Sequence, residues 1–243
     1  MVTRNDPQLS VETRAAPERK AESVKALLSK IEKDFAPATF ASSFGVEDML
    51  LLDLIVRFVP GIEIFTLDTG RLPEETYALM NKIAERYGVK VRVYFPQAKA
   101  VEQYVQQHGP NAFYESVELR KACCHMRKVE PLKRALAGKK AWITGMRRGQ
   151  SVTRGATPES EFDKDHGLYK FNPLYDWTEK EVWAYVRDHD VPYNALHDKG
   201  YTSIGCAPCT RAITPGEDIR AGRWWWENAG NKECGLHRKS EAA

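Results

Sequence analysis

Five cysteines constrain this chain more than any other residue type, because of where they stand. Cys123 and Cys124 are adjacent, and Cys206 and Cys209 form a CxxC pair. Cys234 stands alone near the end of the chain, in a polar segment with a glycine beside it. Two close cysteine pairs are typical of a metal or iron–sulfur site, and a lone thiol in such a segment indicates a reactive group. Together they indicate sulfur redox chemistry.

The composition is ordinary for a globular protein with one large domain. Of 243 residues, 42% are hydrophobic and 28% are charged, which is enough for a full α/β core. The net charge of 36 − 33 = +3 is too small to indicate a nucleic-acid partner. No apolar stretch reaches the roughly 18–20 residues that span a bilayer, and the N-terminus lacks the apolar segment of a signal peptide. We therefore expect a cytoplasmic protein with no membrane partner, in which thiols stay reduced.

The order of the expected elements predicts an α/β fold. Hydrophobic periodicity predicts helices over residues 21–34, 46–58, 73–87 and 178–189, and strands over 38–44, 61–67, 89–95 and 140–144. Strands that alternate with helices imply a mostly parallel sheet with helices on both faces. The polar residues 1–20 are expected to form a disordered arm, residues 21–226 a single α/β catalytic domain, and residues 227–243 a mobile tail that carries Cys234.

Three of these strands end in segments that suit a nucleotide or phosphate. Ligands of open α/β sheets bind beyond the carboxyl ends of the strands. Hydroxyls, a glycine and helix N-terminal amides meet in the segment Ser42-Ser43-Phe44-Gly45, although a simple capped turn would look the same. The second segment is Leu67-Asp68-Thr69-Gly70-Arg71, which alone reads as a tight turn. The third, Thr144 to Gln150 with Arg154 beyond it, contains adjacent arginines that match phosphate oxygens.

Considered alone, the four paired cysteines are compatible with two kinds of metal site. Four thiolates can hold zinc or an iron–sulfur cluster. Adjacent cysteines are awkward as two ligands of a single zinc ion, and burial as small hydrophobic residues is a further alternative. Lys128 follows Cys124 by four residues, so on a helix it would face the thiolates and any anion beside them. Arg127 and Lys121 compete with it for that role.

The C-terminal part combines basic residues, tryptophans and the lone thiol. Arg220 and Arg223 precede Trp224-Trp225-Trp226, and we expect these tryptophans to pack against the domain rather than to stack on bases. The segment after them ends in Glu233-Cys234-Gly235-Leu236-His237. An exposed free cysteine is a liability unless it is used. The neighbouring cations, His237 among them, would lower its pKa or bind the anion it attacks.

These motifs together resemble a known family, the bacterial assimilatory adenylyl-sulfate (APS) reductases. The match rests on the two cysteine pairs, on Arg220-x-x-Arg223-Trp-Trp-Trp and on the Glu-Cys-Gly-Leu-His tail, and it covers nearly the whole chain after residue 20. The resemblance implies an adenine nucleotide alpha-hydrolase-like fold, a 4Fe–4S cluster and thioredoxin as the reductant. It implies that Cys234 is the nucleophile and that the cluster ligands are Cys123, Cys124, Cys206 and Cys209.

The resemblance also assigns the substrate site. The nucleotide would be held by Ser42, Ser43, Gly45, Leu67, Gly145 and Arg154, and the phosphosulfate by Lys128, Arg220, Arg223 and His237. Phe44-Gly45 departs from the Ser-Gly-Gly loop of ATP-cleaving relatives, which speaks against ATP hydrolysis. The alternatives are a reductase of 3′-phospho-APS (PAPS), a tRNA-thiolating enzyme and a non-catalytic iron–sulfur sensor. We favour APS, expect no nucleic-acid partner and leave a homo-oligomer open.

Overall fold

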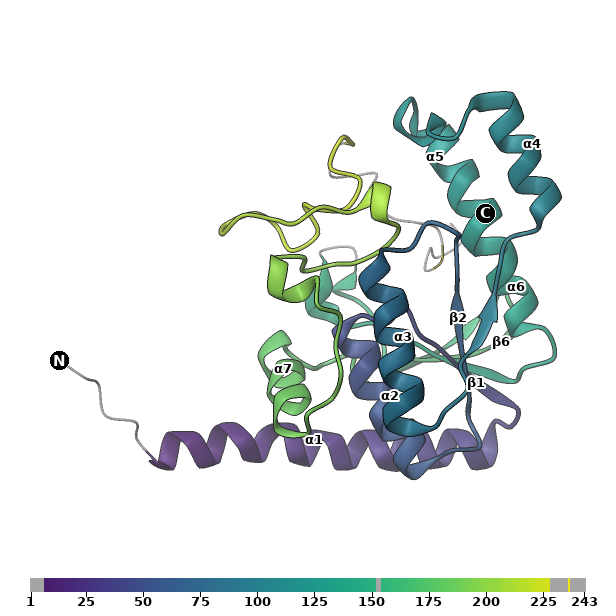
Figure 1. The fold of residues 1–243 in the computed structure, drawn as a ribbon. Coiled ribbons are helices and arrows are strands. Elements are labelled where there is room, and N and C mark those ends of the chain that lie inside the picture. Colours follow the sequence, from purple (N-terminus) through teal and green to yellow (C-terminus); the bar gives the residue numbers. More distant parts are fainter. Residues whose placement is uncertain (1–6, 152–153, 228–235, 237–243) are drawn as a thin grey trace.

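A computed structural model describes residues 7–151, 154–227 and 236, and for residues 7–15 the backbone alone. Within these residues the centre of the fold is a six-stranded sheet in the order β3-β2-β1-β4-β6-β5 (Figure 1). Neighbouring strands are parallel except for the antiparallel pair β5 and β6. The strands are β1 Ala38–Ala41, β2 Glu63–Leu67, β3 Arg92–Tyr94, β4 Ala141–Ile143, β5 Ser160–Asp163 and β6 Leu168–Phe171.

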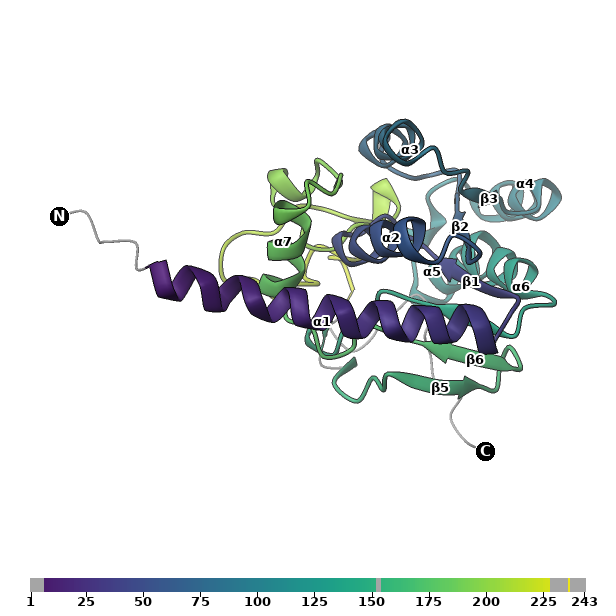
Figure 2. The same cartoon turned by 90° about the horizontal axis from the view of Figure 1, so that it is seen from below.

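Helices cover both faces of this sheet, as Figure 2 shows from below. One face carries a large hydrophobic core shared with α1, α2, α3 and α7. The opposite face carries a small core, which comprises Phe65, Leu132, Ala135, Leu136, Trp142 and Leu168 and is covered by α6. The helices are α1 Pro7–Asp34, α2 Val46–Phe58, α3 Glu74–Tyr87, α4 Ala98–His108, α5 Val117–Cys124, α6 Glu130–Leu136 and α7 Glu179–Asp188.

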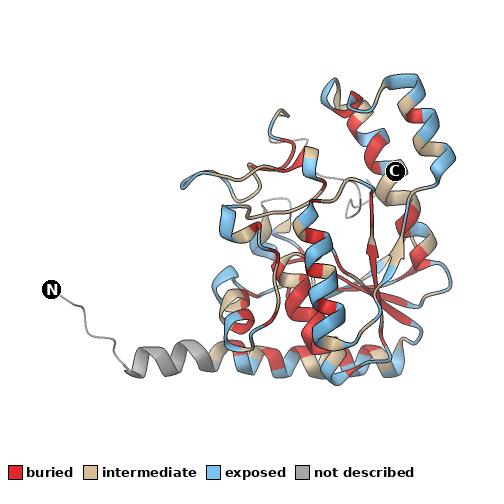
Figure 3. Cartoon of the chain, in the orientation of Figure 1, coloured by how far each residue is buried: buried red, intermediate tan, exposed pale blue. Residues whose placement is uncertain are grey.

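The alternation of side chains along each strand produces these two cores. Ile64 belongs to the large core and Phe65 to the small one, and Ile143 and Trp142 divide in the same way. Successive side chains of a strand point to opposite faces, so a strand buried on both faces is apolar throughout. Figure 3 shows the buried residues concentrated on the strands and on the helix sides that face them. The predicted fold class, with helices on both faces, is confirmed.

The N-terminal helix corrects the expected disordered arm. α1 begins at Pro7 rather than near residue 21, so residues 7–20 are helical. Ion pairs with the region of α7 explain how a polar segment is held. Lys20 Nζ donates to Glu181 Oε2 at 3.1 Å, and Glu18 Oε1 lies 3.0 Å from His189 Nε2. No helix in the described ranges is long and apolar enough to cross a membrane.

The helix that carries the adjacent cysteines contains a π-helical segment. α5 continues through the π turn His125–Val129 directly into α6, with helical backbone angles at the junctions. Pro131 explains the wider turn, because proline lacks an N–H donor and its ring collides with the carbonyl four residues earlier. Such π turns are frequent at functional sites. Ser116 caps the start of α5 by accepting a hydrogen bond from the Leu119 amide at 3.1 Å.

Candidate active site

A cavity of about 470 Å³ opens at the carboxyl ends of β1, β2 and β4. β1 and β4 are neighbours in the sheet, and the order of the strands reverses between them, which is where α/β sheets bind ligands. Every predicted substrate-binding residue that the structure describes lines this cavity, although the segments come from the whole length of the chain. These residues are Ser42, Ser43, Gly45, Leu67, Lys128, Gly145, Arg154, Arg220 and Arg223. The predicted His237 and the predicted nucleophile Cys234 lie outside the described residues.

The loop after β1 is organised by its own hydroxyls and by Asp48. The Phe44 amide donates to Ser42 Oγ at 3.2 Å, and both the amide and the hydroxyl of Ser43 donate to Asp48 Oδ2 at 2.6 Å. Phe44 has φ of +59°, a left-handed conformation that favours glycine, and its side chain is 1% exposed in the large core. Burial of the ring offsets this backbone strain. The loop therefore keeps a turn that suits glycine while it carries a core side chain.

Asp48 joins the loops that follow β1 and β4. A Cβ atom at position 145 would overlap Asp48 Oδ1, so only glycine allows the carboxylate to approach the β4 loop. Burial raises the pKa of Asp48 to about 6, although its hydrogen bonds with Ser43 and the Gly145 backbone act in the opposite direction. The sequence does not predict this role of Asp48, because acidic residues are common in the first turn of a helix.

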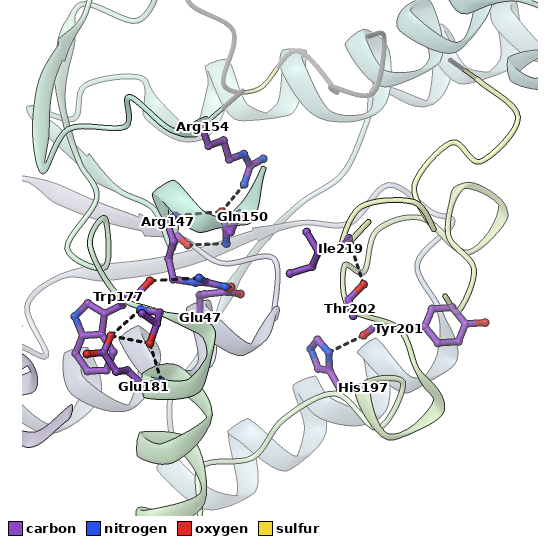
Figure 4. Close-up of polar contacts among 12 residues, drawn as sticks. Glu47, Arg147, Gln150, Arg154, Trp177, Glu181, His197, Tyr201, Thr202 and Ile219 are labelled. Atoms are coloured by element: carbon purple, nitrogen blue, oxygen red, sulfur yellow. Dashed lines mark hydrogen bonds and ion pairs between the residues drawn. The ribbon is translucent and has the colours of Figure 1, made fainter. Parts of the chain in front are cut away.

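Gln150 connects the arginines of the β4 loop, as Figure 4 shows. Its Oε1 accepts from Arg154 Nη1 at 2.6 Å and from the Arg147 amide at 3.1 Å, and its Nε2 donates to the Gly145 carbonyl at 3.2 Å. The side chain of Arg147 turns away to Glu47 Oε1, with Nη2 at 2.7 Å. Arg147 thus holds the loop on α2, and Arg154 is the arginine of this loop that we predicted as a ligand.

The four paired cysteines come together in one buried group. They share a small hydrophobic cluster, which we call the cysteine core, with Tyr104, Ala112, Phe113 and Trp224. Each of the four is at most 9% exposed. Burial raises the pKa of Cys123 and brings that of Cys209 to about 12. Among the described residues, no three histidine, cysteine, aspartate or glutamate side chains are placed to share one metal ion. The 4Fe–4S cluster therefore stays a prediction here.

Cations near the cysteine core also border the cavity. Burial alone would raise the pKa of Cys206, but Lys128, the Thr69 hydroxyl, Arg223 and Arg127 outweigh it, so the net shift is downward. Thr69 Oγ1 lies 3.3 Å from Cys206 Sγ. Lys128 also lines the cavity, whereas the competing Lys121 is exposed on α5.

Arg223 and the tryptophans fix the segment that follows the CxxC pair. The Arg223 guanidinium lies 4.6 Å from the Trp224 ring centroid, and a side chain at Gly205 would collide with it. Its Nη1 donates to the Ile204 carbonyl at 3.3 Å. Trp224 is 1% exposed and Trp226 packs on the cysteine core, which confirms the expected packing for these two, while Trp225 is 40% exposed.

Two contacts of the C-terminal region were beyond sequence reasoning. Arg120 and Glu227 form a buried ion pair beside the cysteine core, with Nη2 2.6 Å from Oε2. Leu236, the one described residue of the tail beyond Glu227, packs on the small core and lines the cavity. No local sequence pattern predicts either contact, because the residues that meet are distant in the sequence. The available sequence signal for the first was the position of Arg120, one helical turn before Cys124.

Comparisons with known proteins agree with this geometry. A family model described as "Phosphoadenosine phosphosulfate reductase domain" matches residues 37–212. The adenosine 5′-phosphosulfate reductase of Allochromatium vinosum is 54% identical over 242 residues, which covers 100% of this chain and 93% of that protein. The Burkholderia cepacia protein of the same name is 57% identical over 218 residues, which covers 90% of this chain and 87% of that one.

Solved structures show the same fold. The crystal structure of phosphoadenylyl-sulfate (PAPS) reductase from Candida auris, a phosphate complex, matches with a TM-score of 0.66 and 26% identity, covering 88% of this chain and 100% of that one. Yeast FAD synthetase in complex with FAD matches with a TM-score of 0.55 and 15% identity, covering 87% of this chain and 70% of that one. The second likeness concerns the fold alone.

Proposed function

The chain belongs to the phosphoadenosine phosphosulfate reductase domain family, and within it we propose that this protein reduces adenosine 5′-phosphosulfate to sulfite and AMP with electrons from thioredoxin. Membership confirms the resemblance read from the cysteine pairs and the tail. The observation that carries the proposal is the cavity itself, which joins three strand-end loops suited to a nucleotide to cations that border four buried cysteines. The relatives named for APS support that substrate.

The proposed substrate position follows from the two ends of the cavity. The nucleotide would lie against the loops after β1, β2 and β4, where Ser42, Ser43, Gly45, Leu67 and Gly145 supply hydroxyls and backbone groups. The phosphosulfate would point toward the cations Lys128, Arg220 and Arg223, with His237 as a further predicted contact, and Arg154 would contact the nucleotide. Arginine forks match the oxygens of such an anion, and preorganised cations stabilise charge that develops on a leaving phosphate.

The proposed reaction has two half-reactions. The Cys234 thiolate attacks the sulfur of the sulfate group, the bond from that sulfur to the phosphate oxygen breaks, and AMP leaves with the electron pair. An S-sulfo-cysteine remains on the tail. A thioredoxin thiolate then attacks the sulfur of Cys234 and releases sulfite, and the second thioredoxin thiol resolves the mixed disulfide. The two electrons come from the dithiol, and Cys234 ends as a thiol. Leu236, two residues from Cys234 in sequence, lines the cavity in which we place the substrate.

The four buried cysteines fit the predicted 4Fe–4S cluster as its ligands. The donor set is four thiols from two segments, which is the usual ligand set of such a cluster, and Lys128 and Arg127 stand beside it. The dithiol already supplies both electrons, so the cluster need not change its oxidation state. When bound, it would order these segments and contribute negative charge near the cations. Reduced cysteine ligands and a free nucleophilic thiol suit the cytoplasm.

Sulfite release by anaerobically purified protein with thioredoxin tests the proposal, with APS and PAPS compared side by side. We expect a strong preference for APS and no turnover by the Cys234→Ser variant, whose visible absorbance should be unchanged. Preference for PAPS would keep the mechanism and refute APS as the substrate. We compare the two because one similar solved structure is that of a PAPS reductase. A Ser variant that still turns over would refute the role of Cys234.

A further inference from the structure

Gln150 joins two backbone segments and a cation of the cavity wall through one side-chain amide (Figure 4). Its Oε1 accepts from Arg154 Nη1 at 2.6 Å and from the Arg147 amide at 3.1 Å, so both lone pairs of this oxygen are used. Its Nε2 donates to the Gly145 carbonyl at 3.2 Å. A guanidinium and a backbone amide can only donate, so the atom that faces them is the oxygen. The partners thus determine the direction of the Gln150 amide.

The turn that carries Gln150 is fastened to the rest of the fold by other groups. The Gln150 backbone amide donates to the Arg147 carbonyl at 3.2 Å. The Arg147 guanidinium donates to Glu47 Oε1 on α2, from Nε at 2.9 Å and from Nη2 at 2.7 Å. The Arg148 amide donates to the Tyr175 carbonyl at 3.0 Å. None of these contacts uses the side chain of Gln150, which is therefore available for another role.

Gly145 is held from a second side by Asp48. Its backbone forms a hydrogen bond with the buried Asp48 carboxylate, and a Cβ atom at position 145 would collide with Asp48 Oδ1. Asp48 on α2 and Gln150 on the β4 loop together fix the orientation of the Gly145 peptide. An amide side chain suits position 150, because it accepts on one atom and donates on the other. A carboxylate there would set an oxygen against the Gly145 carbonyl.

We propose that Gln150 is a positioning residue, which orients the Gly145 backbone and the Arg154 guanidinium relative to each other before the nucleotide binds. The inference rests on the proposed function, in which both groups contact the nucleotide. All three residues line the cavity. The cations that we place at the phosphosulfate lie on other segments of the chain. Gln150 therefore acts on the binding of the nucleotide and not on the breaking of the bond between sulfur and oxygen.

The Gln150→Met variant keeps the length of the side chain and removes its hydrogen bonds. The binding nucleotide must then order the Arg154 side chain and the Gly145 peptide, which the wild type already holds in place. We expect the dissociation constant of AMP to rise about tenfold, which corresponds to about 1.4 kcal/mol. A contact that stabilises the bound substrate and the transition state equally changes KM alone, so KM for APS should rise about tenfold while kcat stays within about twofold. A residue needed only for folding would not divide KM from kcat in this way.

Calorimetric titration of the full-length holoprotein with AMP, together with the kinetics of sulfite release from APS, tests the inference. Gln107→Met is the matched control, because this glutamine is exposed on α4 and does not line the cavity. In an Arg154→Met background, Gln150→Met should weaken AMP binding by only about threefold, since one of the two groups that it orients is already absent. Gln150→Glu keeps the Arg154 contact and opposes the Gly145 carbonyl, so it should also weaken AMP binding about threefold.

The outcomes separate this inference from the proposed function. An AMP affinity of Gln150→Met within about twofold of the wild type would overturn the inference, and so would a loss of about tenfold that persists in the Arg154→Met background. If Gln150→Met does not fold, an unchanged AMP affinity of Gln150→Glu overturns it instead. A wild type that binds AMP but releases no sulfite from APS refutes the proposed function, and weaker AMP binding by Gln150→Met would then still support the role of Gln150.

Discussion

Replacing Glu227 by glutamine tests how strongly the cysteine core depends on one buried charge. The isosteric Glu227→Gln change keeps one oxygen for Arg120 Nε and places an amide donor against Nη2. The arginine then keeps its charge in a position with 1% side-chain exposure and loses its counter-ion. Because the guanidinium cannot lose its proton, the cost of burying its charge without Glu227 appears as lost stability.

The magnitude follows from the two hydrogen bonds and from the burial. Hydrogen bonds to charged groups contribute about 1.5–3 kcal/mol each, and breaking a buried pair by removing one partner costs about 3–5 kcal/mol. Since glutamine keeps one acceptor, we expect about 3 kcal/mol of lost unfolding free energy. With an unfolding entropy of about 2.1 cal/mol/K per residue, a chain of this length should melt roughly 6 °C lower.

Urea denaturation followed by circular dichroism measures this loss, and the chain offers a matched control. Arg211 and Glu217 also form an ion pair with two hydrogen bonds, but their side chains are 38% and 29% exposed. Solvent screens that pair, so Glu217→Gln should change stability far less. The double variant Arg120→Met with Glu227→Met should recover most of the loss, because apolar side chains replace both members of the buried pair. Equal effects of the two glutamine variants would refute the reasoning.

Three further outcomes are expected. Gly145→Ala displaces the Asp48 carboxylate from the β4 loop, and calorimetric titration with AMP should show at least a tenfold loss of affinity. Because burial raises the pKa of Asp48 from 3.8 to about 6, the folded state binds more protons than the unfolded state between these two pH values. Stability of the wild type relative to Asp48→Asn should therefore fall as pH rises from about 4 to 6, in urea titrations at each pH. Thr69→Val removes the hydroxyl beside Cys206, so the visible absorbance of the proposed 4Fe–4S cluster should bleach faster in air, while Thr69→Ser should behave as wild type.

The sequence predicted best where one local signal decides the structure. The helix Val46–Phe58 was predicted with its observed bounds, because an apolar run follows Gly45 and acidic residues occupy its first turn. The capping box at Thr178 marked the start of α7. The predicted ligands at the strand ends line one cavity, because the carboxyl ends of parallel strands meet at one edge of a sheet.

The sequence failed where distant residues decide the structure. The hairpin of β5 and β6 was missed, since an edge strand such as Ser160–Asp163 is half exposed and carries charges. The Arg147–Glu47 and Arg120–Glu227 ion pairs join residues that are 100 and 107 positions apart. Burial of charge at such separations follows from the assembled fold and has no local pattern. Glu18 and Lys20 misled for the same reason, because their partners His189 and Glu181 are distant in the sequence.

The π turn before α6 sets the direction of the cysteine side chains independently of the side of α6 that packs on the sheet. A uniform α-helix would fix both together. In an α-helix each residue advances the direction of its side chain by about 100°, so the cysteines at the end of α5 and the apolar side chains of α6 would have a fixed angular relation. The wider turn at His125–Val129 changes that relation without changing either helix. A chain with one residue deleted there would keep its strands and loops, yet Cys123 and Cys124 would point about a quarter of a turn away from their present partners. The direction of the Cys123 and Cys124 side chains thus depends on the number of residues in the π turn as well as on their identity. Insertions or deletions in this short stretch would be tolerated far less than substitutions on its exposed side.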